Sequence, residues 1–126
     1  MFSDDDYPLY LEGFVFAGTN LRALMGGRFR MDHCVFDGAD LTDMTLTSAC
    51  FQSCTFTGAV LRNVMLDEVM FLDCDLTGAV IDGLTCDAFT RTALLSNGNL
   101  LGPGLRSTLT STPPPLTITV RDAGLT

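Results

Sequence analysis

The sequence predicts an all-β solenoid, a β-helix of about four square coils that is closed at its C-terminal end by a short helix. Three observations support this fold class. Apolar residues recur at every fifth position from Leu11 to Cys86, the charged residues of that stretch fall at other phases, and a period of twenty is superposed. A period of five matches neither an α-helix nor a flat strand, so the chain must turn a corner in every repeat.

The five-residue register divides the residues into two inward and three outward phases. Gly26 is the single gap in the main inward series. The core positions predicted by that series are Phe16, Leu21, Phe36, Leu41, Leu46, Phe51, Phe56, Leu61, Leu66, Phe71, Leu76 and Ile81. A second, uncharged series lies two residues earlier and includes mainly small residues such as Cys34 and Ala39. Leu24, Phe29, Met44 and Leu84 are large for that series, so we expect local widening or a bulge near Gly26.

The period of twenty indicates that four five-residue repeats make one coil. Residues twenty apart should then lie above one another at the ~4.8 Å spacing of paired strands, which gives a rod of roughly 15–20 Å. Gly18, Gly38, Gly58 and Gly78 would form one corner column, where glycine relieves backbone strain. No proline occurs between Leu9 and Gly102, as expected for a backbone whose donors are used in stacking.

Segments such as Ala39-Asp40-Leu41-Thr42-Asp43 and Ala59-Val60-Leu61-Arg62-Asn63 resemble the pentapeptide-repeat family. That family's consensus alternates a small residue such as Ala or Cys with a central Leu or Phe two residues later. The resemblance covers about two-thirds of the chain and implies a right-handed quadrilateral β-helix. It also implies a non-catalytic role, because many members are scaffolds or recognition segments, including segments of bacterial secreted effectors.

The chain divides by composition into four segments. Residues 1–8 form an acidic lead-in, 9–90 the β-helix, 91–101 a C-terminal cap and 102–126 a tail rich in Pro, Gly and Thr. The cap is predicted as a short helix between Asp87 and Asn97, stopped by Asn97-Gly98 and packed on the last coil, because an open coil exposes its final ladder. Gly102-Pro103-Gly104 indicates a linker, and Leu116 to Val120 indicates either a short strand or a flexible tail.

The charge of the chain restricts its partners. Fifteen acidic residues against seven arginines give a net charge of −8, which argues against direct binding to nucleic acid or to an anionic membrane. A protein partner is expected instead. No apolar run is long enough to cross a bilayer, and the acidic N-terminus is unlike a secretory signal, so a cytoplasmic protein is expected, with a secreted effector as the alternative.

No residue pattern indicates catalysis, a metal or a cofactor. Cys34, Cys54 and Cys74 should stack in one inward column, where cysteine acts as a small apolar filler, and no histidine shares it. Cys50 is predicted to face outward as the one reactive thiol. The single histidine, His33, should be exposed on a convex surface that offers no second positioned group for acid–base chemistry.

Apolar and acidic residues at the outward phases predict an interaction surface. The predicted surface residues are Met25, Met65, Met70, Leu72, Asp37, Asp40, Asp43, Asp67, Glu68, Asp73 and Asp75. Exposed apolar side chains tend to mark contacts, and the cluster from Met65 to Leu72 indicates a partner or self-association surface.

Two functions follow, apart from a less favoured enzymatic one. The first is a protein-interaction or scaffold module that displays an acidic, partly apolar flat face. The alternative is a DNA mimic that binds DNA gyrase or topoisomerase and inhibits or protects it, as some members of the resembled family do. Four coils would imitate only about half a turn of duplex. A homodimer through the cap, between Phe89 and Leu95, or through an edge face would double that length.

Overall fold

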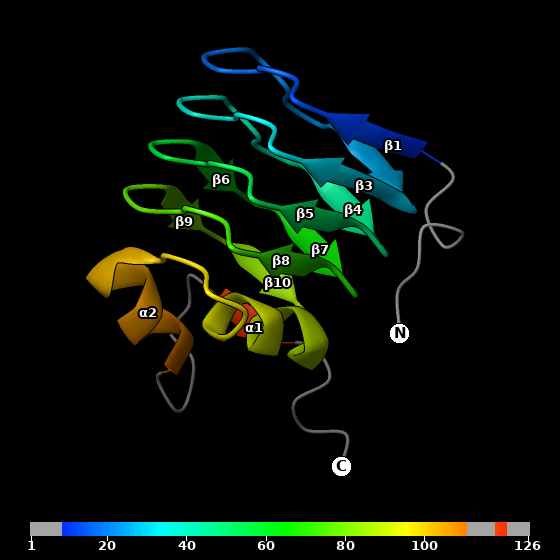
Figure 1. Cartoon of the computed structure of the whole chain (residues 1–126). Helices are drawn as coiled ribbons and strands as arrows, with labels where there is room; N and C mark the ends of the chain where they lie inside the picture. The colour runs from blue at the N-terminus through cyan, green and yellow to red at the C-terminus, as the bar shows by residue number, and fades with distance from the viewer. Residues whose placement is uncertain (1–8, 111–117, 121–126) are drawn as a thin grey trace.

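The computed structural model describes residues 9–110 and 118–120, and it confirms the predicted solenoid. Four coils of short parallel strands stack along one axis, and two helices lie at the C-terminal end (Figure 1). The strands are β1 (Leu9–Glu12), β2 (Met25–Gly27), β3 (Phe29–Asp32), β4 (Thr45–Thr47), β5 (Cys50–Gln52), β6 (Val60–Arg62), β7 (Met65–Asp67), β8 (Met70–Leu72), β9 (Val80–Asp82), β10 (Leu84–Cys86) and β11 (Ile118–Val120).

The coils have four sides, which we call faces 1 to 4 in chain order. Face 1 is the sheet β1-β3-β5-β8, and face 4 is the sheet β11-β10-β7-β4-β2. Face 2 is a column of single bridges from Val15 to Leu100, and face 3 contains β6 and β9. Pairs such as Leu9 with Phe29 and Val60 with Val80 show that partners from one coil to the next are twenty residues apart, as the sequence period predicts.

The corners are made by residues with positive φ. At the corner after face 2, Gly18, Gly38, Gly58 and Gly78 have φ between 68° and 75°. The other corners use mostly non-glycine residues in the same left-handed conformation, among them Ala23, Arg28, His33, Asp43, Ser48, Ser53, Asn63, Glu68 and Asp73. Glycine adopts this conformation without steric cost. Only the corner after face 2, where glycine recurs on every coil, therefore has an evident sequence signal.

The core runs along the axis and is built from both inward series. Of the main series, the residues from Phe36 to Leu76 are buried, while Phe16, Leu21 and Ile81 are partly buried against them. The rings of Phe16, Phe36 and Phe56 stack on successive coils with centroids 5.1 and 4.9 Å apart. Stacking of this kind buries a continuous core that no single coil encloses.

No bulge forms at Gly26. The β2 strand pairs with β4 in an unbroken register, with Gly26 beside Leu46. The ring of Phe29, which is large for its position, lies 3.6 Å from where a Gly26 side chain would begin. An oversized residue in the small series therefore fills the space that the missing main-series side chain leaves.

The helix α1 (Ala88–Leu95) covers the fourth coil, as predicted, and polar side chains bond the coil's edge. Asp87 caps the helix by accepting a hydrogen bond from the Thr90 backbone N–H, and it accepts a second from the Glu68 N–H. The Thr90 hydroxyl accepts from the Val69 N–H, and the Asn99 side chain accepts from the Cys74 N–H at 2.8 Å. These side chains, together with backbone hydrogen bonds of Asn97 and Leu100, take the place of a fifth coil.

A second helix, α2 (Gly102–Thr110), lies where the sequence indicated a linker. Proline is tolerated in the first turn of a helix, because the first N–H groups have no partner within the helix. Leu101 and Leu109 are buried and Leu105 is partly buried, so leucines four residues apart place one side of this segment on the core. The apolar spacing, rather than the Gly-Pro-Gly sequence, decides the local structure.

The strand expected between Leu116 and Val120 is described from Ile118 to Val120 as β11, which pairs in parallel with β10 and extends face 4. The other residues predicted as lead-in or tail, 1–8, 111–117 and 121–126, lie outside the described residues. Within the described part of the chain, neither helix has the length and apolar character that crossing a membrane requires.

Candidate interaction surface

Face 4 displays a column of alternating methionine and threonine. The register aligns Met25, Thr45, Met65 and Thr85 on successive coils. Met25 is 75% exposed and Met65 is 41% exposed, which is unusual for large apolar side chains held on rigid strands. We call these four residues the Met/Thr column. It forms a straight apolar strip along one side of the rod.

Met70 and Leu72 do not belong to that strip. Both lie in β8, on face 1, and both are half-buried beside α1, which packs against β8. The corner at Glu68 and Val69 separates them from Met65. The structure therefore divides the predicted Met65–Leu72 cluster between two sides of the rod.

The predicted acidic positions fall into two groups. In the first group, carboxylates hold the turns of the solenoid. Asp40 accepts hydrogen bonds from the Thr42 N–H and hydroxyl at 3.1 and 2.6 Å, and these bonds lower the pKa of Asp40. Asp75 makes the equivalent bond to Thr77, with the same effect on its pKa, and Asp37 accepts from the Thr57 N–H. Asp37, Asp40 and Asp75 are half-buried, and their bonds stabilise the fold.

The second group is more exposed. Glu68, Asp73 and Asp43 are exposed at corners, and Asp67 is half-buried at the end of β7. Asp43 accepts a hydrogen bond from the Asn63 amide at 2.7 Å and lies 4.0 Å from Arg22. Asp67 and Glu68 border the Met/Thr column where β7 ends. Face 4 thus combines an apolar strip with two acidic residues at its margin on the third coil.

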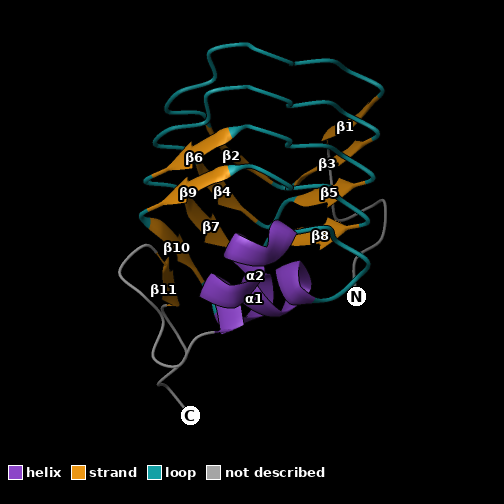
Figure 2. Ribbon diagram, turned by 90° about the vertical axis from the view of Figure 1, so that its left-hand side faces the viewer, coloured by secondary structure: helices purple, strands orange, loops and turns teal. Residues whose placement is uncertain are grey.

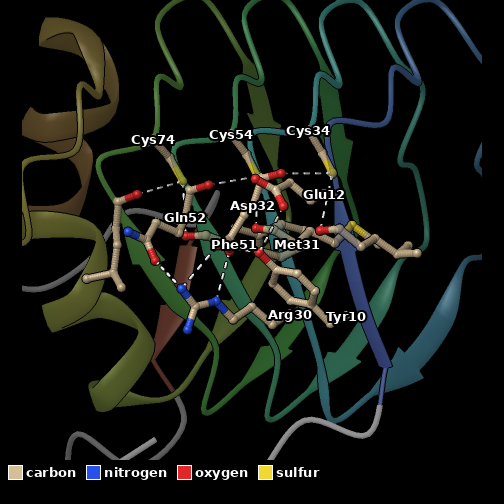
Figure 3. A network of polar contacts seen from close by, with 12 residues as sticks. Tyr10, Glu12, Arg30, Met31, Asp32, Cys34, Phe51, Gln52, Cys54 and Cys74 are labelled. Atoms are coloured by element: carbon tan, nitrogen blue, oxygen red, sulfur yellow. Dashed lines mark hydrogen bonds and ion pairs between the residues drawn. The ribbon is translucent and has the colours of Figure 1, made fainter. Parts of the chain in front are cut away.

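A polar network on face 1 was not predicted from the sequence. The Arg30 guanidinium donates two hydrogen bonds to Asp32, at 2.8 and 3.1 Å, and a third to Gln52, while the Tyr10 hydroxyl donates to Asp32 at 3.0 Å (Figure 3). Asp32 is buried, although its phase faces outward. The network joins three coils and pairs the Asp32 carboxylate, whose outward phase predicts exposure, with the Arg30 guanidinium.

Cys50 is buried, so its predicted role as an exposed, reactive thiol is wrong. It is only 2% exposed, because the register places this small side chain between Arg30 and Met70 on the adjoining coils. Burial raises the pKa of Cys50 to about 11. All five cysteines are free and buried, and the Cys54 and Cys74 thiols donate to backbone carbonyls at 3.2 and 3.3 Å.

The structure offers little for chemistry. His33 is exposed at a corner. Among residues 9–110 and 118–120, no group of three His, Cys, Asp or Glu side chains could hold a metal ion. An apolar cavity of about 20 Å³ lies inside the C-terminal half, lined by residues such as Phe56, Leu84, Leu94 and Leu105. This volume is close to that of one water molecule, which is too small for an organic ligand.

The family model for pentapeptide repeats matches residues 30–63 and 51–83, with eight copies of the repeat. The matched residues span the second and third coils and the fourth coil as far as β9. Residues 30–83 are thereby identified as pentapeptide repeats. The right-handed quadrilateral β-helix is the fold that the sequence resemblance implied.

No curated protein shows significant sequence similarity to this chain. Among solved structures, it is similar to trypsin-treated QnrB1, described as a plasmid-mediated fluoroquinolone resistance protein. The identity is 18% and the TM-score 0.38, over 63% of this chain and 50% of that one. The matched region therefore spans half the length of the QnrB1 chain.

Proposed function

We propose that the chain is a non-catalytic protein-interaction module that binds a protein partner through face 4. The observation on which this rests is the exposure of Met25 and Met65 in one straight column, with Glu68 exposed at its margin. Methionine adapts its shape to apolar partners, and a rigid backbone lowers the entropy lost on binding. The partner that fits is a protein with apolar side chains flanked by basic residues.

The small size of the cavity near Leu94, about 20 Å³, favours binding over catalysis. General acid–base chemistry needs two positioned groups and a site that limits access by water. His33 lies on a convex corner, and the cavity near Leu94 has only apolar lining. A surface-display role is consistent with both features.

Charge substitution on face 4 tests the proposal. Met65→Asp places a charge in the Met/Thr column, and Val80→Asp is the matched control, because Val80 is 40% exposed on face 3. A partner recovered from lysate of the source organism should bind the native chain and the Val80→Asp variant, and should lose at least tenfold in affinity for Met65→Asp. Equal binding by both variants, or equal loss, would contradict recognition through face 4.

The alternative function is mimicry of DNA toward gyrase or topoisomerase, and the charge of −8 favours it. The exposed carboxylates Asp43, Glu68, Asp73 and Asp82 would carry the mimicry. The test is a gyrase supercoiling assay with the native chain and with a variant in which these four residues are changed to Asn or Gln. Inhibition at low micromolar concentration that disappears in the variant would establish mimicry, and no inhibition by the native chain would exclude it for this enzyme.

A further inference from the structure

The two ends of the solenoid differ. The C-terminal end is covered by α1 and α2, whereas no other described helix or strand lies beyond the first coil (Figures 1 and 2). Leu9 and Phe14 occupy inward phases, yet they are 51% and 49% exposed. Their equivalents on the second coil, Phe29 and Cys34, are 7% and 0% exposed. Leu9 and Phe14 are exposed because no coil lies beyond them, although their phases point inward. The N-terminal end of the rod is therefore apolar and open.

The backbone of β1 has unused hydrogen-bonding groups at this end. Tyr10 pairs with Arg30 and Glu12 with Asp32, and the Gly13 N–H donates to the Asp32 carbonyl at 2.9 Å. In a parallel ladder, Arg30 and Asp32 bond to the residues on either side of their partners, so they bond to Leu9, Leu11 and Gly13. The N–H and C=O groups of Tyr10 and Glu12 therefore point away from the second coil.

These groups are complementary to themselves under two-fold symmetry. If β1 strands from two copies run antiparallel about Leu11, Tyr10 of one copy lies opposite Glu12 of the other. Each such pair exchanges two hydrogen bonds in an antiparallel ladder, so the two pairs form four. Hydrogen-bonded pairs in an antiparallel ladder recur at every second residue, and Tyr10 and Glu12 have this spacing.

We propose that the open end, defined by Leu9–Glu12 and Phe14, binds the same end of a second copy in a two-fold head-to-head dimer with antiparallel β1 strands. A coil of this size has an end of roughly 500 Å² including side chains, from the strand dimensions. Two such ends bury about 1,000 Å², which is at the lower limit of specific interfaces, so a micromolar dimer is expected. The proposal is independent of the proposed function, because it leaves the Met65 part of face 4 uncovered.

Sedimentation velocity of the full chain, from about 1 to 200 µM, is the first test. The native chain should shift from monomer to dimer across this range, and Leu9→Glu with Phe14→Glu should remain monomeric. The matched control is Phe89→Glu with Leu100→Glu at the capped end, where these residues are 39% and 59% exposed. The control should dimerise like the native chain. A native chain that stays monomeric, or a dimer lost only in the control, would overturn the proposal.

Spin-label distances give a second test that does not depend on disrupting the first coil. Val15 and Leu100 are exposed at opposite ends of the face 2 column, and the five native cysteines are buried, so labels attach to Val15→Cys or Leu100→Cys alone. The two positions are four strand spacings apart, or about 19 Å. In a head-to-head dimer the distance between the two labels at position 15 is shorter than at position 100 by up to about 40 Å. The reverse order would show tail-to-tail association and refute the proposal.

Discussion

At the scale of single residues, the size of the neighbours on adjoining coils decides whether an outward residue is exposed. Cys50 has an outward phase, but Arg30 and Met70 lie above and below it and cover the small thiol. Asp32 likewise has an outward phase, and hydrogen bonds from Arg30 and Tyr10 enclose its carboxylate. Phase indicates the direction of a side chain, and the column through it determines its exposure.

The burial of the thiols leads to a residue-scale prediction. No cysteine should react rapidly with Ellman's reagent in the native protein at pH 8, because all five are buried and burial raises the pKa of Cys50 to about 11. All five should react after denaturation in guanidinium chloride. One equivalent of fast native reaction, removed by Cys50→Ser, would show that Cys50 is accessible after all.

At the scale of elements, the cap shows how a helix can end a β-solenoid. A solenoid coil offers N–H and C=O groups along its edge, and a helix has no backbone groups free to pair with them along its length. The side chains of Asp87, Thr90 and Asn99 supply part of the missing partners, and the backbone after α1 supplies the rest near Leu100. The apolar residues Ala93 and Leu94 cover the core. The polar side chains of the cap thus bond the edge of the coil, and its apolar side chains exclude water from the core.

The Asp87 carboxylate should make the cap sensitive to acid. Burial opposes its ionisation, but hydrogen bonds from Thr90 and Glu68 outweigh that effect and lower the pKa of Asp87 below 3.8. A lowered pKa in the folded state means that ionised Asp87 stabilises the fold above about pH 4, and that this contribution is lost as the pH falls through the folded-state pKa. Asp87→Asn keeps a capping side chain and removes the charge, so it should cost about 0.3–1 kcal/mol at pH 7, the usual contribution of a negative charge at a helix N-terminus.

Urea denaturation at pH 7 and at pH 2.5 measures this effect. The difference between the native chain and Asp87→Asn should be present at pH 7 and shrink toward zero at pH 2.5. Asp82→Asn is the control, since Asp82 is exposed, and it should leave the free energy of unfolding nearly unchanged. A difference of the same size at both pH values would mean that the charge of Asp87 does not contribute.

At the scale of the whole molecule, burial increases from the open end toward the middle of the rod. Phe16, Phe36 and Phe56 share one column and one phase, yet Phe16 is only partly buried, while Phe36 is 3% and Phe56 is 2% exposed. In a repeat protein each coil is stabilised by its two neighbours, and the first coil has one. The contribution of a core residue therefore depends on its position along the rod.

Matched substitutions along this column test the gradient. Phe56→Ala should destabilise by about 3–5 kcal/mol, the range for a fully buried phenylalanine, and Phe16→Ala by less than half as much. The measurement is the free energy of unfolding in urea, with Phe56→Leu and Phe16→Leu as milder substitutions if Phe56→Ala does not fold. The comparison is made below 1 µM, because the head-to-head dimer would cover the first coil at higher concentration. Equal losses of stability at the two positions would mean that the first coil is covered even in the monomer.

The parts of the fold that follow from repetition could be predicted from the sequence. Each coil repeats the same phases, so errors at single positions such as Gly26 do not change the register of the others. The α2 helix was missed because Gly102-Pro103-Gly104 is a local turn signal. Leu101, Leu105 and Leu109 stabilise the helix by packing on the core, and the sequence does not show that this part of the core is open to them. The sequence likewise did not show that Met65 and Met70 lie on different faces of the rod, because their separation depends on the corner between β7 and β8.

The sequence by itself determined the five-residue turn, the twenty-residue coil and the division of side chains between core and surface, because these depend on the order of residues within a repeat. Only the tertiary structure decided which outward residues are accessible, which carboxylates hold turns and which end of the rod is covered. Those properties depend on what lies one coil above or below, about 4.8 Å away in space and twenty residues away in the chain. Side-chain size and hydrogen-bond geometry between neighbouring coils determine these properties, and periodicity does not.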